Sequence, residues 1–239
     1  MRIRDEGAVR LDVAALVVAG TVDLLAGIDG GLILKHGSLT GGGDLACRSE
    51  WIADHTARWQ AGWSFWFVVT TTFAWGFYAL ARNLGGPRQW RDLAVGLALL
   101  AAAVDLVGIV VNLALLPDLA ARYHDSPTLV ASTAVTYSTV ETLAQALTDI
   151  AAYGLYTAAG LLLLPALFVT RTYPRALAWL GVLLWGVSAA ATLLLAFDAA
   201  GATAVFAVAL LLYAPWVWAS AWWVSTHGVH EMPAERRRA

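Results

Sequence analysis

The sequence predicts an all-α polytopic integral membrane protein, a single bundle of about six transmembrane helices. The first observation is composition: of 239 residues, 59% are apolar and 13% are charged, with a mean hydropathy of +0.66. A soluble domain has roughly 45–50% apolar and about 25% charged residues. The second observation is that six apolar stretches are long enough to cross a hydrocarbon core about 30 Å thick. A soluble chain of this length could not bury so much apolar surface in one core.

The first three predicted spans are residues 11–34, 63–81 and 93–116, each bounded by charged or turn-forming residues. The first apolar run is longer than that of a signal peptide, carries Asp23 and lacks a small-residue cleavage site. We therefore expect it to remain in the protein as a membrane helix. The external loop 35–62, with three glycines at 41–43, is expected to be irregular and to fold back over the outer face.

The last three predicted spans are residues 143–170, 176–197 and 202–224. Periodic sequence runs without a breaker from about residue 129 into the fourth span, which is about twice the length that one crossing needs. We interpret residues 129–142 as an amphipathic lead-in, either lying on the membrane surface or projecting from it. A polar tail, residues 225–239, follows the sixth span, and the whole chain is predicted to be one transmembrane domain.

The placement of basic residues predicts orientation. Eleven of the 15 Lys and Arg residues lie at the two termini and in the second and fourth loops. Cytoplasmic segments of membrane proteins carry such an excess of basic residues. We therefore expect the protein to lie in the cytoplasmic membrane of the cell with both termini on the cytoplasmic side. A net charge of -2 supplies no basic field for nucleic acid, which is excluded as a partner class. Cys47 is the only cysteine, so no internal disulfide can form.

Acidic residues at membrane depth are the first functional candidates, because an unpaired charge in hydrocarbon costs several kcal/mol. Asp23 lies within the first span and Asp105 within the third. The fourth helix carries a polar stripe at every fourth residue: Tyr137, Glu141, Gln145, Asp149 and Tyr153. No Lys, Arg or His lies within the predicted spans, so these acids are expected to lack a counter-charge. They are then protonated, or hold a cation, water or each other. The alternative is that each is a hydrogen-bonded contact between helices.

Aromatic residues are the second functional signal, with 12 Trp in the chain. Trp66 shares a face of the second span with Trp59, Trp63 and Thr70, and Trp216 adjoins Pro215, which is expected to kink the sixth span. Aromatic rings beside an acid can stabilise a cationic ligand or a carbocation-like intermediate. The alternative is that most of these rings anchor the helices at the membrane interface or fill the core.

These patterns predict an acid-bearing, aromatic-lined cavity for a small hydrophobic ligand. Candidate catalytic residues are Asp149 as general acid with Asp105 or Asp23 as its partner, and Glu141 on the same stripe. Candidate ligand-binding residues are Trp66, Asn112, Tyr153 and Trp216. The predicted chemistry is a proton-initiated isomerisation or cyclisation of an isoprenoid, with no cofactor and no metal. His227, His230 and Glu231 have a spacing compatible with a metal, but they lie in the polar tail.

Two alternatives to an enzyme remain open at this point. One is a proton-coupled carrier that uses the same acids as a relay. The other is a non-catalytic subunit of a membrane complex. Small residues line a face of the first span (Ala19, Gly27, Gly31) and of the third (Ala101, Gly108), and such faces allow close helix contact, including in a homo-oligomer.

Two resemblances add expectations. Thr148-Asp149-Ile150 at the start of a glycine-containing span, followed by Arg171-Thr172-Tyr173-Pro174-Arg175-Ala176-Leu177, resembles a bacterial family of six-span membrane proteins known only as a domain of unknown function. That resemblance implies six helices with both termini inside and no particular activity. In its size, tryptophan content and intramembrane acids the chain is also similar to the small integral-membrane terpene cyclases, which implies acid-initiated cyclisation.

Overall fold

The computed structural model describes residues 6–125, 130–197 and 199–227, and these residues form helices with no strand among them. Six helical spans are long and apolar enough to cross a membrane, which confirms the all-α bundle. The bounds of the long elements are α1 Glu6–Leu32, α3 Thr56–Asn83, α4 Arg88–Val110, α7 Tyr153–Val169, α8 Arg175–Ala196 and α9 Ala202–His227. The shorter elements are η1 Leu34–His36, η2 Leu39–Gly41, α2 Leu45–Asp54, η3 Val111–Leu115, α5 Leu116–Asp125, α6 Val130–Gln145 and η5 Ala146–Ala152.

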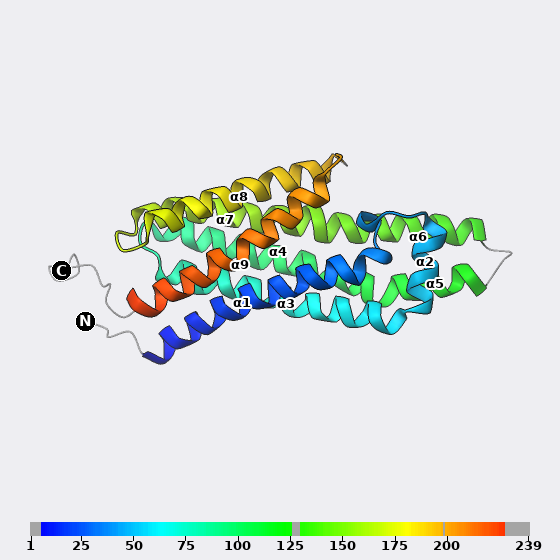
Figure 1. Cartoon of the computed structure of the whole chain (residues 1–239), viewed down its shortest axis with the longest axis horizontal. Helices are drawn as coiled ribbons and strands as arrows, with labels where there is room; N and C mark the ends of the chain where they lie inside the picture. The colour runs from blue at the N-terminus through cyan, green and yellow to red at the C-terminus, as the bar shows by residue number, and fades with distance from the viewer. Residues whose placement is uncertain (1–5, 126–129, 198, 228–239) are drawn as a thin grey trace.

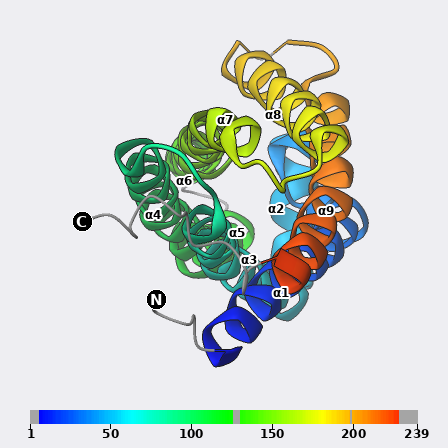
Figure 2. The same cartoon turned by 90° about the vertical axis from the view of Figure 1, so that its left-hand side faces the viewer.

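The long helices form a closed ring. Each packs on the next in the order α1, α3, α4, α7, α8 and α9, and α9 returns to pack on α1. Figure 2 shows this ring from one end. The start of α1 and the end of α9 lie at the same end of the bundle, here called the terminal end (Figure 1). The opposite end, which carries η1, η2, α2, α5 and α6, is called the loop end.

The third and fourth spans are much longer than one crossing. The π-helical segment η3 and then α5 continue α4, and the span Arg88–His124 has 37 residues. In the fourth span, α6, the π-helical η5 and α7 form one continuous helix, of which Ala131–Val169 has 39 residues. At 1.5 Å per residue these measure about 55–60 Å, against a core of about 30 Å. Helix α6 lies alongside α5 and extends past the ends of the other long helices (Figure 1). Residues 117–125, which follow the third predicted span, are also helical and belong to α5.

The predicted external loop 35–62 is mostly helical, so the expectation of an irregular segment is wrong. It contains η1, η2 and α2, and residues 56–62 are the first turns of α3. Asp44 starts α2, and its Oδ1 accepts a 2.8 Å hydrogen bond from the Cys47 backbone N–H, as an N-cap residue does. That bond lowers the pKa of the Asp44 carboxyl. Helix α2 packs on α5, which packs on α6, and these three helices are called the distal lobe.

Aromatic side chains fill the terminal half of the ring. Trp185 contacts both Tyr213 and Trp216, with ring centroids 6.4 and 5.8 Å apart. A Cβ on Gly160 would lie only 2.1 Å from the nearest ring atom of Trp185. Glycine is therefore required at position 160. Pro215 lies inside α9, which continues past it to His227. This aromatic core closes the terminal half and leaves the loop half of the ring for the site.

Candidate functional site

A cavity of about 430 Å³ occupies the loop half of the ring. Asp23 borders it from α1, Asp105 from α4 and Asp149 from η5. The structure thus brings three of the four predicted acids, from three different spans, to one space. The volume lies within the roughly 300–1,000 Å³ of small-molecule sites.

Aromatic rings form the wall and floor of this cavity. Trp66 lines it, as expected, together with Trp63 from the same face of α3. Tyr153 also lines it and packs edge-on against Phe206 of α9, with ring centroids 4.7 Å apart. Phe73 and Tyr156, whose centroids are also 4.7 Å apart, separate the cavity from the aromatic core.

The three cavity acids have different hydrogen-bond environments. The Thr70 hydroxyl of α3 donates to Oδ2 of Asp105, and the Thr148 hydroxyl lies 3.0 Å from Oδ1 of Asp149. Asp23 is 1% exposed, and its Oδ2 has no hydrogen-bond partner among the described residues. Buried carboxyl oxygens normally have a hydrogen-bond partner. Among the three cavity acids, Asp23 therefore has an oxygen that is available to bind a proton or a ligand.

Glycines of α1 make room for the cavity. The stripe through Asp23 does place that residue inside the bundle, but its glycines do not bring helices together. A Cβ on Gly31 would meet nothing within 4 Å, and Gly27 and Gly31 both line the cavity. Close approach occurs instead at Gly20, where a Cβ would lie 2.5 Å from Val217 of α9. In the third span, a Cβ on Gly108 would lie 2.6 Å from Thr148, so that small-residue face packs within the chain.

Trp216, predicted as a wall residue, lies elsewhere. Its side chain is 2% exposed and belongs to the aromatic core, and it is not among the residues that line the cavity. Its Nε1 lies 3.0 Å from the position of a Cβ on Gly181, so it packs directly on α8. The prediction for Trp216 as a cavity residue is therefore wrong, because the helical face beside Pro215 points into the packed half of the ring.

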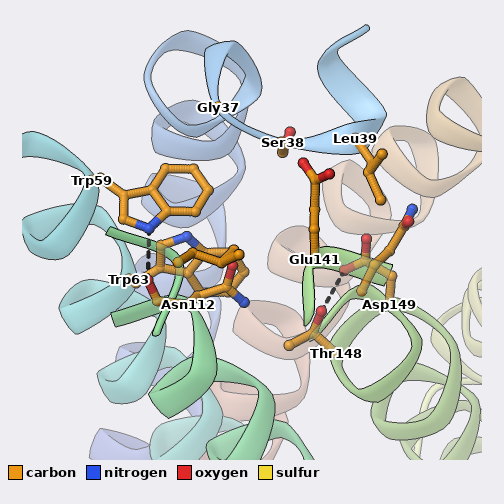
Figure 3. A pocket seen from close by; sticks show the side chains of 11 residues that line it. Gly37, Ser38, Leu39, Trp59, Trp63, Asn112, Glu141, Thr148 and Asp149 are labelled. Atoms are coloured by element: carbon orange, nitrogen blue, oxygen red, sulfur yellow. Dashed lines mark hydrogen bonds between the residues drawn. The ribbon is translucent and has the colours of Figure 1, made fainter. Parts of the chain in front are cut away.

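A second, smaller pocket of about 40 Å³ lies toward the loop end (Figure 3). Asn112, predicted for ligand binding, lines this pocket and not the large cavity. The Asn112 side-chain Nδ2 donates to the Gly108 backbone carbonyl at 2.9 Å, and the Asn112 backbone carbonyl accepts from Nε1 of Trp59 at 2.7 Å. Both π-helical segments, η3 and η5, contribute to the lining. Such segments are frequent at functional sites because they free backbone carbonyls.

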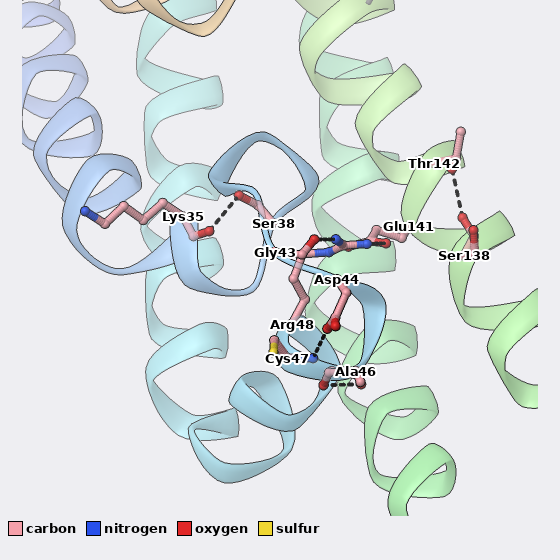
Figure 4. A network of polar contacts seen from close by, with 11 residues as sticks. Lys35, Ser38, Gly43, Asp44, Ala46, Cys47, Arg48, Ser138, Glu141 and Thr142 are labelled. Carbon is pink, nitrogen blue, oxygen red and sulfur yellow. Dashed lines mark hydrogen bonds and ion pairs between the residues drawn. The ribbon is translucent and has the colours of Figure 1, made fainter. Parts of the chain in front are cut away.

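Glu141 lines the small pocket and is paired, so the expectation that the acids lack a counter-charge is wrong for it. Oε1 accepts from Nε of Arg48 at 2.8 Å, and Oε2 accepts from Nη2 at 2.9 Å (Figure 4). Arg48 also donates to the Gly43 carbonyl, at the end of the glycine run. A second acid, Asp12, is paired at the terminal end, where Arg82 lies 3.3 Å from its Oδ2. Both arginines come from outside the predicted spans.

Several lining residues were not predictable from the sequence. Phe73 and Phe206 belong to apolar helices whose hydropathy marks no inner face, so no signal distinguished them from lipid-facing rings. Lys35, Ser38 and Gly41 line the loop end of the cavity from the segment expected to be irregular. Arg48 also lies in that segment, and nothing in the sequence pairs it with Glu141.

No three His, Cys, Asp or Glu side chains gather closely enough to hold a metal ion within residues 6–125, 130–197 and 199–227. His230 and Glu231, noted for their spacing, lie outside the described residues. Comparison of the chain with protein-family models, curated proteins and solved structures finds no match. The functional argument therefore depends on the geometry of the two pockets.

Proposed function

We propose that this protein is a membrane-embedded enzyme that binds a small, largely apolar molecule in the large cavity and isomerises or cyclises it by proton transfer. The observation that carries the proposal is the convergence of Asp23, Asp105 and Asp149 on one aromatic-walled cavity. An isoprenoid is the substrate class that fits this lining, because its chain is apolar and its double bonds accept a proton.

The chemistry requires only groups that the cavity contains. The Asp149 carboxylic acid donates a proton to one carbon of a substrate double bond, forming a C–H bond and leaving a carbocation on the other carbon. In a cyclisation a second double bond attacks that cation, which forms a C–C bond and a new cation that then loses a neighbouring proton. In an isomerisation the first cation itself loses a neighbouring proton. The proton lost goes to a carboxylate, that of Asp105 or of Asp149 itself, so no cofactor is consumed.

The aromatic lining supports the same step. The faces of Trp66 and Tyr153 present negative electrostatic potential to a developing cation, and each such contact contributes about 0.5–2 kcal/mol. Ionised carboxylates nearby also stabilise positive charge. A bound substrate that fills this apolar lining excludes bulk water, which protects the carbocation from addition of water.

The test is product formation by purified protein in lipid nanodiscs with prenyl alcohols and diphosphates of increasing length, analysed by gas chromatography and mass spectrometry. Asp149→Asn is expected to abolish the product while leaving binding intact. The control is Asp29→Asn, because Asp29 is another acid within a membrane span, on α1, but does not line the cavity. Equal product from wild type and Asp149→Asn would refute the proposal.

A proton-coupled carrier is the second candidate, and one observation favours it. The cavity reaches Lys35 and Ser38 at the loop end but is bounded by Phe73 and Tyr156 toward the terminal end, as in a carrier open to one side. Accumulation of a prenyl compound in proteoliposomes that follows an imposed pH gradient and is lost in Asp105→Asn would support the carrier. Product formation without accumulation would support the enzyme.

A further inference from the structure

Asp149 borders two separate spaces. Ser38, Trp63, Thr148 and Asp149 line both the large cavity and the small pocket. Figure 3 shows Asp149 at the edge of the small pocket, with the Thr148 hydroxyl bonded to it. One carboxyl group therefore lies between a space large enough for a ligand and a space too small for one.

The small pocket has the size and chemistry of a water site. A buried water needs at least about 10–15 Å³ of such volume, so 40 Å³ holds two or three waters. A buried water also needs two to four polar partners, roughly. Side chains of Asn112, Glu141, Gln145 and Thr148 supply them around the pocket.

Glu141 supplies carboxylate oxygens to the lining of the small pocket. Its carboxylate is held by two hydrogen bonds from Arg48, and each carboxylate oxygen retains a lone pair for water. Gln145 lies one helical turn closer to Asp149 on the same helix, so the polar side chains form a continuous row toward the acid. The η1–η2 segment lies over this row at the loop end through Gly37, Ser38 and Leu39 (Figure 3).

A ligand that fills the large cavity displaces water from one side of Asp149. The small pocket cannot hold the ligand and stays wet on the other side. We infer that the small pocket is a water-filled proton path by which the loop-end solution reprotonates Asp149 while the large cavity is occupied. In each transfer a new O–H bond forms on the next oxygen as the previous one breaks. The use of this path, although not its existence, rests on the proposed function.

Infrared spectroscopy of the protein in nanodiscs tests this path. The C=O stretch of protonated Asp149, identified by its loss in Asp149→Asn, shifts when its proton exchanges for deuterium after transfer to D₂O at acidic pH. Gly30→Trp places an indole ring in the large cavity as a partial substitute for a ligand, and its Cβ fits there at 3.8 Å from Trp66. Gln145→Leu removes the polar side chain between Glu141 and Asp149 at nearly constant volume.

Gly30→Trp alone is expected to exchange at close to the wild-type rate through the small pocket. Adding Gln145→Leu is expected to slow exchange by roughly tenfold or more, because it removes the polar side chain between Glu141 and Asp149 and leaves water at that point without a hydrogen-bond partner. The matched control, Gln89→Leu in the Gly30→Trp background, removes an exposed amide at the start of α4 that lines neither pocket, and it should leave the exchange rate unchanged. Fast exchange in Gly30→Trp/Gln145→Leu, or exchange in Gly30→Trp as slow as in that double variant, would overturn the inference. The measurement needs no substrate, so its result is independent of the product assay.

Discussion

Arg48 and Glu141 form a buried ion pair between residues 93 positions apart in the chain, with side chains 9% and 5% exposed. The pair links α2 to α6 within the distal lobe and lies beside the small pocket. Its two parallel N–H···O bonds of 2.8 and 2.9 Å give the geometry that an arginine fork makes with a carboxylate. The orientation of Glu141 in the small pocket therefore depends on a residue from another segment.

Removing one partner of this pair should be costly. Arg48→Met leaves the Glu141 carboxylate buried without its partner, and such losses destabilise by about 3–5 kcal/mol. Arg122→Met breaks the Asp118–Arg122 pair of 2.9 Å, whose side chains are mostly exposed, and should cost less than about 1 kcal/mol. The measurement is the free energy of unfolding by SDS titration in mixed micelles. The double variant Arg48→Met/Glu141→Leu should recover most of the loss. Equal effects of the two single variants would contradict the structure.

The single cysteine reports on the start of α2. The Asp44 side chain raises the pKa of the exposed Cys47 thiol by hydrogen bonding and by charge, and Glu50 adds a smaller contribution. Asp44→Ser removes the charge but keeps an N-cap oxygen, so the thiol pKa should fall. Because the thiolate is the nucleophile, the pH midpoint of iodoacetamide alkylation should then move down. Glu50→Gln should move the midpoint less, and an equal or larger shift in that control would contradict the assigned contact.

The same contact makes α2 sensitive to acid. The hydrogen bond from the Cys47 backbone lowers the pKa of Asp44 from its ordinary value of 3.8, so the ionised form stabilises the folded helix. That stabilisation is present above pH 3.8 and is lost as the pH falls through the lower folded value. Hydrogen–deuterium exchange of the α2 backbone amides, corrected for the intrinsic rate at each pH, should therefore show a loss of protection in acid in wild type and not in Asp44→Ser.

The predicted orientation can be tested with the same cysteine. If the positive-inside excess places the termini in the cytoplasm, the loop end lies outside. Cys47 is exposed at the loop end and should react with a membrane-impermeant maleimide in intact cells. In Cys47→Ser/Ser225→Cys the cysteine lies at the exposed terminal end of α9 and should react only after permeabilisation. The reverse pattern would place the cavity opening on the cytoplasmic side.

Hydropathy and spacing predicted the parts of this structure that depend on a single helix. Each span is set by the length of its apolar run, and the inner face of α1 at Asp23 follows from its small-residue stripe. Relations between helices could not be predicted in the same way. The closure of α9 onto α1 and the Arg48–Glu141 pair depend on segments far apart in sequence, and one sequence contains no signal that pairs them.

The sequence was sufficient to identify the acidic residues of the site but not the extent of the cavity around them. Asp149 was expected because a carboxyl in hydrocarbon needs a reason to be there, whatever its neighbours. The prediction of Trp216 as a cavity residue was wrong because aromatic rings occur both in packed cores and in cavity walls, and the residue type alone does not distinguish the two. The division into a large and a small space was not predictable either. Trp63 of α3 and Thr148 of the π-helical segment η5 line both spaces, and their proximity depends on the packing of separate helices.

Filling the large cavity should remove ligand binding without loss of stability. A Cβ on Gly27 would make an ordinary contact of 3.8 Å with Leu210, so Gly27→Leu places its side chain in the cavity without a clash. Gly96→Leu is the matched control, because a Cβ on that exposed glycine of α4 meets nothing within 4 Å. Each substitution also removes a glycine from a helix, worth about 0.5–1 kcal/mol in favour of folding. Binding of a tritiated prenyl alcohol should therefore fall only in Gly27→Leu, while both variants unfold at or above the wild-type temperature. Unchanged binding in Gly27→Leu would mean that the ligand occupies another part of the bundle.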